Sequence, residues 1–138
     1  MTIFEMLRKH EGVETHAYKC TAEKTTIGVG RNIDPNGGIG LSNDEIDYLL
    51  ANDVKRVNDE LLGAFGWYKT LGTERKDAMI DMCFNMGLPR LMQFKKALGA
   101  MSAKNYDSAA VEFLDSRWAK QVGQRAISIT DIIRSGES

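Results

Sequence analysis

Three residues near the N-terminus have the types and the spacing that a catalytic site requires. Glu11, Cys20 and Thr26 follow a Glu-x8-Cys-x5-Thr pattern, and Gly28 and Gly30 come directly after them. In hydrolysis of a glycosidic bond, one group protonates the leaving oxygen, a second activates or positions a water molecule, and a third orients that water. The segment therefore predicts both a tight turn and a site suited to hydrolysis of a glycosidic bond.

Two capping boxes mark the starts of helices on either side of this segment. Thr2 and Glu5 predict a short helix over about 3–11, which Gly12 can end. Ser42 and Glu45 open a second helix over about 43–62, whose apolar residues recur at helical spacing. This second helix is long enough to connect two lobes.

The residues between the two helices favour strands and turns. Segments 16–20 and 25–29 are short and rich in strand-forming residues, with a turn at 22–24 between them. Residues 34–38, Asp-Pro-Asn-Gly-Gly, are typical of a turn. We expect a small antiparallel sheet that is too small to be stable alone.

Everything after the long helix is predicted to form short helices. They are expected over 73–86 with Thr73 as its cap, from Pro89 onward, around 106–114, and over about 123–134. The expected fold is α+β, a single domain over 1–138 with a sheet lobe at about 12–42. The helical lobe is expected at about 63–138 together with helix 3–11, with the long helix joining the lobes.

The composition describes an ordered globular protein. Hydrophobic residues make up 43% of the chain and charged residues 27%, with a net charge of −1. Residues 88–138 carry 8 basic against 5 acidic side chains. This excess suits an anionic polymer such as bacterial cell wall, or it is simply a solvated surface.

Several classes of site and segment are not expected. The two cysteines lie 63 positions apart and form neither a zinc pattern nor a disulfide framework, and we expect no metal or cofactor. Cys83 and the methionines at 79, 82, 86 and 92 are interpreted as core residues. The sequence predicts no signal peptide, membrane span or nucleic-acid site.

The order of several short motifs resembles that of the phage-type lysozymes, or endolysins. The matching runs are 1–12, 26–30, 82–87, 107–111, 116–118 and 125–126. The resemblance implies a lysozyme fold with a cleft between the lobes. It also implies inverting cleavage of the β-1,4 bond between N-acetylmuramic acid and N-acetylglucosamine in peptidoglycan, for host lysis by a phage.

The resemblance assigns roles to individual residues. Glu11 matches the general acid and Thr26 the hydroxyl that holds the nucleophilic water, while Arg125 falls where the family places a basic residue against the acid. An Arg31–Asp53 pair is expected to clamp the sheet lobe to the long helix. Substrate contacts are expected at four positions: Gly30, Asn32, Phe84 and Asn85.

The chain departs from the family pattern at informative places. Cys20 occupies the second catalytic position, where the T-even members have Asp and the wider family includes Cys. It can act as a base, as a nucleophile or as a bystander. Ala97 and Glu112 replace polar cleft residues, and the connection before the long helix is about 17 residues shorter.

Three functions remain open at this point. The first is a muramidase, the second a lytic transglycosylase, and the third a peptidoglycan-binding protein without catalysis. The expected partner is peptidoglycan, and we expect a monomer in the host cytoplasm. A holin is then needed for access to the wall in the periplasm.

Overall fold

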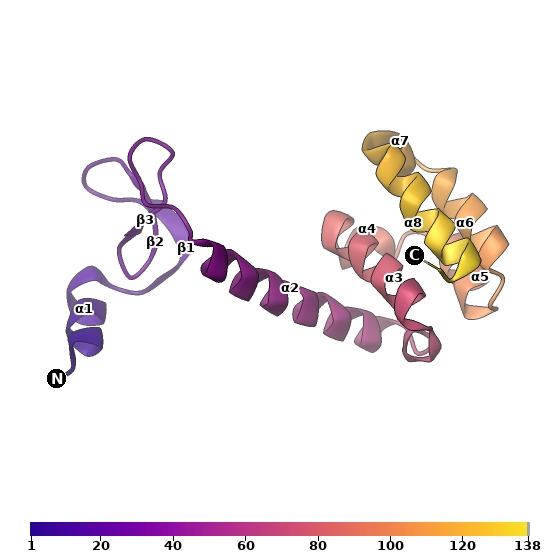
Figure 1. Cartoon of the computed structure of the whole chain (residues 1–138), viewed down its shortest axis with the longest axis horizontal. Helices are drawn as coiled ribbons and strands as arrows, with labels where there is room; N and C mark the ends of the chain where they lie inside the picture. The colour runs from indigo at the N-terminus through magenta and orange to yellow at the C-terminus, as the bar shows by residue number, and fades with distance from the viewer. Residues whose placement is uncertain (138) are drawn as a thin grey trace. The chain divides into compact units, whose positions relative to one another are not determined.

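The computed structural model describes residues 1–137 and confirms a mixed α+β fold (Figure 1). The chain forms two compact units, Met1–Leu49 and Leu50 onward. The first unit holds the sheet and the second is helical. The grouping of the first helix with the helical lobe, and the cleft between lobes, stay predictions.

The first helix has the predicted bounds. α1 covers Ile3–Glu11, and the Glu5 amide donates to Thr2 Oγ1 at 3.1 Å, as the capping box requires. Gly12 follows at φ +79°, a backbone conformation that glycine adopts without strain. Glu11 is therefore the last helical residue before the chain turns into the sheet.

The sheet has three antiparallel strands in the order β1-β2-β3. They cover Glu14–Lys19, Thr25–Gly28 and Arg31–Asn32. The first two strands and the turn between them confirm the prediction, although β1 begins two residues earlier than expected. β3 was not predicted because two residues carry no alternation pattern.

Polar contacts, in place of an apolar core, hold the sheet unit together. No apolar side chain of residues 1–49 is buried, whereas the Asp34 side chain is only 8% exposed. Its carboxylate accepts hydrogen bonds from the backbone amides of Thr25 and Asn36, both at 3.0 Å. These two bonds lower the pKa of Asp34 to about 2. The turn at 34–38 is thus fixed to β2.

An ion pair ties β3 to the start of the long helix. Arg31 Nη2 lies 2.7 Å from Glu45 Oε2, and Arg31 Nη1 also donates to the Gly40 carbonyl at 2.9 Å. Glu45 completes the predicted capping box by accepting from the Ser42 amide at 2.9 Å. The Arg31 bonds, followed by those from Ser42, lower the pKa of Glu45 to about 2.

The two residues of the expected Arg31–Asp53 pair belong to different units, and each has another partner within its own unit, so the pair itself stays a prediction. Arg31 pairs with Glu45, and Asp53 Oδ1 lies 3.2 Å from Arg56 Nη2. The short connection after β3 brings the first turn of the helix within reach of the guanidinium. Asp53 stands two turns further along the same helix and finds its cation three residues away.

The long helix and the shorter helices follow the predicted order. α2 covers Asn43–Ala64. After it come, in order, η1 Tyr68–Thr70, α3 Thr73–Met86, α4 Leu88–Leu91, α5 Lys95–Ser102, α6 Tyr106–Leu114, α7 Arg117–Val122 and α8 Gln124–Ser135.

The helical unit corrects three details of the prediction. Thr73 is the first residue of α3 and not its cap. The helix expected from Pro89 is divided into α4 and α5. α7 was not predicted, although Ser116 caps it by accepting from the Ala119 amide at 3.1 Å.

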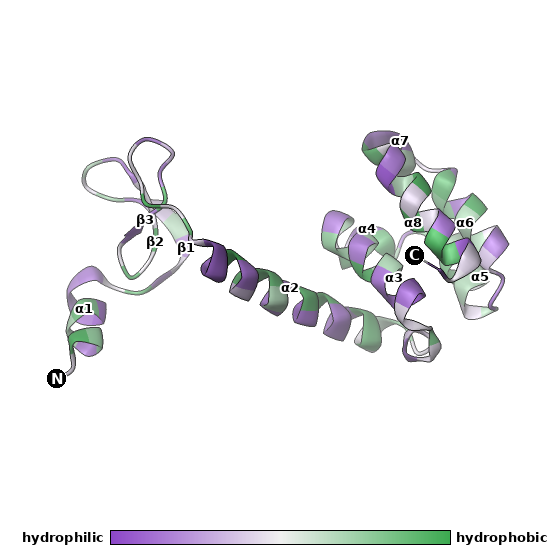
Figure 2. Ribbon diagram, viewed as in Figure 1, coloured by the Kyte–Doolittle hydropathy of each residue, from purple (hydrophilic) through white to green (hydrophobic). Residues whose placement is uncertain are grey.

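The apolar core lies in the helical unit. Its largest fully buried side chains include Tyr68, Phe113 and Trp118. In Figure 2 the helices of this unit carry both hydrophobic and hydrophilic residues. Met79, Met82 and Cys83 are buried as expected, while Met92 is 48% exposed because it follows α4 in a turn.

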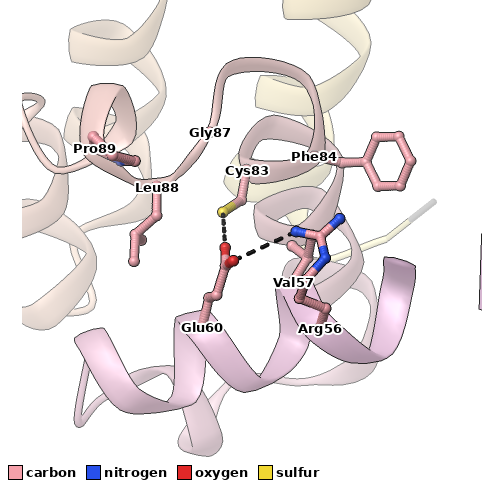
Figure 3. A pocket seen from close by; sticks show the side chains of 8 residues that line it. All are labelled: Arg56, Val57, Glu60, Cys83, Phe84, Gly87, Leu88 and Pro89. Carbon is pink, nitrogen blue, oxygen red and sulfur yellow. Dashed lines mark hydrogen bonds and ion pairs between the residues drawn. The ribbon is translucent and has the colours of Figure 1, made fainter. Parts of the chain in front are cut away.

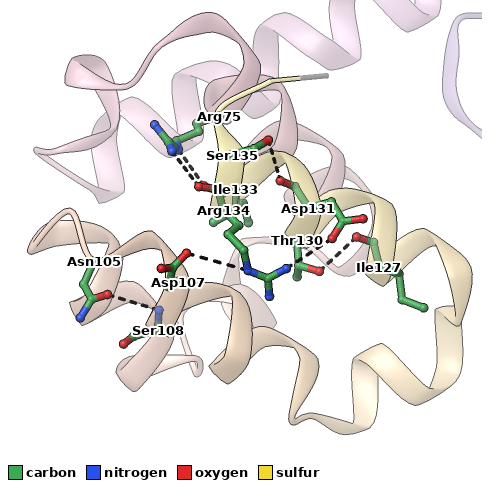
Figure 4. Close-up of polar contacts among 10 residues, drawn as sticks. All are labelled: Arg75, Asn105, Asp107, Ser108, Ile127, Thr130, Asp131, Ile133, Arg134 and Ser135. Carbon is green, nitrogen blue, oxygen red and sulfur yellow. Dashed lines mark hydrogen bonds and ion pairs between the residues drawn. The ribbon is translucent and has the colours of Figure 1, made fainter.

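Arg75 of α3 binds backbone carbonyls at the end of α8 (Figure 4). Its Nε donates to the Ile133 carbonyl at 2.7 Å, and its guanidinium carbon lies 3.6 Å from the centre of the Tyr106 ring. The last carbonyls of a helix have no partner within the helix. Arg75 supplies one and also connects α3, α6 and α8.

The lowered pKa values of Asp34 and Glu45 predict that the sheet unit loses stability in acid. Both carboxylates have a pKa near 2 in the folded chain, below their ordinary values of 3.8 and 4.5. Their stabilisation is therefore present above about pH 4.5 and is lost as the pH falls toward 2. In amide hydrogen exchange, the protection factors of the β2 amides, which correct for the intrinsic effect of pH on the rate, should fall over this window.

Asp34→Asn and Glu45→Gln should each lower these protection factors at neutral pH and reduce their pH dependence. Asp47→Asn is the matched control, since Asp47 is exposed and has no such partner among the described residues. An unchanged acid profile in both variants would contradict the role of these carboxylates.

Candidate active site

Glu11 packs against the turn that joins β2 and β3. A Cβ atom added to Gly30 would lie 2.7 Å from Glu11 Oε2 and 3.1 Å from its carboxyl carbon. Real Cβ atoms do not approach other atoms so closely. In this conformation the Glu11 carboxyl therefore occupies the space that a side chain at position 30 would take, and Gly30→Ala requires it to move.

Thr26 lies on the central strand and is 4% exposed. It pairs in register with Tyr18 of β1 and Asn32 of β3. Its hydroxyl donates to the Lys24 carbonyl at 2.8 Å. Since the single hydroxyl proton points to this carbonyl, the oxygen lone pairs remain to accept a hydrogen bond from another group.

Cys20 lies at the base of the β1–β2 turn, beside Thr26. The Cys20 amide donates to the Lys24 carbonyl at 3.0 Å, which closes the turn. The nearby backbone amides of Lys24 and Ala22 lower the pKa of the Cys20 thiol because they stabilise its thiolate. The environment of this thiol favours the thiolate.

Asn32 contributes to the turn next to these residues. Its Oδ1 accepts from the Asp34 amide at 3.0 Å. A Cβ atom at Gly38 would lie 2.6 Å from this oxygen and 2.5 Å from the Asp34 backbone. The side-chain carbonyl of Asn32 is thus engaged in the turn, which leaves the side-chain amide nitrogen for the predicted substrate contact.

Four of the residues that the sequence predicts for the site belong to the helical unit: Asp53, Phe84, Asn85 and Arg125. Phe84 of α3 is 45% exposed and lines a pocket of about 410 Å³ with Arg56 and Glu60 of α2 (Figure 3). Its role in a cleft wall stays a prediction. The side-chain oxygen Oδ1 of Asn85 accepts a hydrogen bond from the Trp118 indole at 2.8 Å, so Asn85 supports the core.

Arg125 of α8 has a partner within the helical unit. Its Nε donates to Asp81 Oδ1 at 2.9 Å, and a second guanidinium nitrogen contacts the same oxygen. Asp53, the remaining predicted support residue, pairs with Arg56. The role of Arg125 beside Glu11 stays a prediction, and Asp81 is a neighbour that the sequence did not indicate.

The structure thus brings one part of the predicted site together in one unit. Glu11 and Gly30 are in contact, and Cys20 and Thr26 are neighbours on the adjoining hairpin. Glu45 was recognised only as a cap, because nothing in its local sequence indicates Arg31 as a partner. Asp34 was included in the turn, but its bond to the Thr25 amide depends on the pairing of distant segments.

Within residues 1–137, no group of three or more His, Cys, Asp or Glu side chains is placed to hold a metal ion. None of the helices in this range has the length and apolar character to span a membrane.

Gly30→Ala and Gly28→Ala provide a test of the Glu11 position. Both glycines have φ +69°, so each substitution costs about 1–2 kcal/mol of backbone strain. Only the Cβ at position 30 meets Glu11, since nothing lies within 4 Å of a Cβ at position 28.

If Glu11 is the predicted general acid, activity on the expected peptidoglycan substrate should fall about a hundredfold more for Gly30→Ala than for Gly28→Ala, because a displaced acid loses its alignment. Rates are compared at equal folded concentration. Equal losses in the two variants would contradict the placement of Glu11.

Comparisons with known proteins identify the family. A family model described as phage lysozyme matches residues 8–132. A probable T4-type lysozyme of Dictyostelium discoideum is 26% identical, with 96% of this chain and 93% of that protein covered. An endolysin of Acyrthosiphon pisum secondary endosymbiont phage 1 is 25% identical, with 87% and 80% covered.

A longer relative contains the same region as one part. The pre-baseplate central spike protein Gp5 of Enterobacteria phage T4 is 27% identical over 99% of this chain but only 28% of its own length. The Dictyostelium alignment extends over 160 positions, more than the 138 residues of this chain, so it contains gaps. The range that the family model matches extends over Glu11, Cys20 and Thr26, and the chain belongs to the phage lysozyme family.

Proposed function

We propose that this chain is a muramidase that hydrolyses the β-1,4 bond between N-acetylmuramic acid and N-acetylglucosamine in peptidoglycan. The observation that supports it most is the contact of Glu11 with the Gly30 turn, in the same compact unit as Cys20 and Thr26. Family membership supports lysozyme activity in general. The identity of the bond is the proposed part.

Glu11 acts as the general acid in this mechanism. Its carboxylic acid donates a proton to the glycosidic oxygen as the bond to the anomeric carbon breaks. The carboxyl lies in the space that the missing Cβ of Gly30 leaves open. Positioned proton transfer of this kind contributes about 10²- to 10⁴-fold to a rate.

Thr26 orients the water that attacks the opposite face of the sugar. Its hydroxyl donates to the Lys24 carbonyl, so the oxygen accepts a hydrogen bond from the water. A water that donates one proton to Thr26 has a lone pair directed elsewhere, toward the anomeric carbon. The buried position of Thr26 keeps this geometry constant.

Cys20 accepts the second proton of the attacking water. The neighbouring backbone amides lower the pKa of the thiol, which increases the fraction present as thiolate at neutral pH. The thiolate thus occupies the role that a carboxylate has in the T-even members. Its proton balance closes because Glu11 loses one proton and Cys20 gains one.

The biological role that fits this chemistry is lysis of a bacterial host by a phage. The partner is peptidoglycan, and neither a metal nor another cofactor takes part in the proposed steps. The protein accumulates in the host cytoplasm as a monomer and acts on the wall after a holin has opened the membrane.

Glu11→Gln tests the assignment of the acid. The amide keeps the shape of the side chain but has no proton to give, so clearing of a peptidoglycan suspension should fall by at least about 10²-fold. Glu14→Gln is the control, since it changes an exposed acid of β1 in the same unit. A Glu11→Gln protein that still clears the suspension at the normal rate would sink the proposal.

Cys20→Asp and Cys20→Ala test the base. If the thiolate is the base, activity rises with pH through the lowered pKa of the thiol. Cys20→Asp should keep much of the activity and move this rise to lower pH, because a carboxylate ionises earlier. Cys20→Ala should remove the rise altogether. An identical pH profile in all three proteins would make Cys20 a bystander.

A further inference from the structure

Two arginines line one hollow of the helical unit, outside the residues assigned to catalysis. The hollow has a volume of about 320 Å³. It is formed by α4, the turn that follows it, and the start of α7. Its lining residues, none of which is acidic, are Arg90, Gln93, Phe94, Ser116, Arg117 and Trp118.

Within the part of the chain that the structure describes, neither arginine has an acidic partner. Arg90 Nη2 donates to the side-chain carbonyl of Gln121 at 2.8 Å, so a neutral group orients this guanidinium. Among the ion pairs within residues 1–137, none involves Arg90 or Arg117. Each guanidinium has five N–H donors, and most of those on Arg90 remain free.

Aromatic packing makes the wall of the hollow rigid. The Phe94 ring lies 5.4 Å from that of Phe113 and meets Trp118 edge-on at 6.4 Å. The Ser116 hydroxyl donates to the Phe113 carbonyl and accepts from the Ala119 amide, so it is already engaged. The polar character of the hollow therefore comes from the two arginines and Gln93.

A second hollow of about 340 Å³ adjoins the first and shares Gln93, Phe94 and Ser116 with it. It adds two lysines and two acids: Lys95, Lys96, Glu112 and Asp115. The acids line only this second hollow. Together the two hollows are lined by four cationic and two acidic side chains, so their lining is basic on balance.

We propose that the hollow of Arg90 and Arg117 binds an anionic group of the wall polymer. A guanidinium matches the planar carboxylate of a peptide and the oxygens of a phosphate equally well, with two parallel hydrogen bonds. The inference depends on the proposed function only for the identity of the polymer. Binding here holds the strand on the helical unit independently of the bond-breaking step.

Binding measured without turnover tests this site. The full chain with Glu11→Gln is titrated, by calorimetry, with three probes: a wall stem peptide with free carboxylates, the same peptide with its carboxylates amidated, and a glycerol phosphate oligomer. We expect a free-carboxylate or phosphate probe to bind, the amidated peptide not to bind, and added salt to weaken binding. The better anionic probe identifies the source of the group.

Arg90→Gln with Arg117→Gln should weaken this binding at least tenfold. The matched control is Lys55→Gln with Lys69→Gln, which removes the same charge from exposed positions of the same unit. Thermal melts establish that both double variants fold. Absence of binding by both anionic probes, or an equal loss in the control, would overturn the site.

The outcome of the binding experiment does not depend on whether the proposed function is correct. A failed binding experiment leaves the effect of Glu11→Gln on peptidoglycan clearing unchanged. Conversely, a Glu11→Gln protein that still hydrolyses peptidoglycan does not affect binding to a peptide or phosphate probe that has no glycosidic bond.

Discussion

The buried carboxylate of Asp34 is the constraint on which the geometry of the β1–β2 hairpin depends. The sheet unit has no buried apolar side chain, so its geometry comes from directed hydrogen bonds. Asp34 binds the amide of Thr25, the residue directly before Thr26, and the Asn36 amide in the following turn. A charged acceptor forms stronger hydrogen bonds than a neutral one. Thr26 is therefore held in place without a core beneath it.

Most of the secondary structure could be predicted because its signals are local. The capping box of Thr2 and Glu5 and the terminating Gly12 define α1 to the residue. α7 was missed because its six residues are too few for a periodic pattern, and its Ser116 cap stands between two helices. The partner of Arg31 was also missed, because it depends on how closely a short connection brings Glu45.

The candidate site likewise combines features that the local sequence predicts with features that depend on contacts between residues far apart in the chain. The spacing of Glu11, Cys20 and Thr26 indicated the chemistry, and the structure adds the reason for Gly30, whose missing Cβ leaves room for the acid. The hollow of Arg90 and Arg117 could not be predicted, since its residues come together only when α4 and α7 pack. Single basic residues in a sequence do not indicate such convergence.

Mass spectrometry of the sugars released from purified peptidoglycan tests the central claim most directly. An attack by water held at Thr26 predicts products with a reducing N-acetylmuramic acid end. Products lighter by one water, with an anhydro end, would contradict hydrolysis and indicate a transglycosylase that uses the sugar's own hydroxyl. No products from folded protein would leave only a peptidoglycan-binding protein.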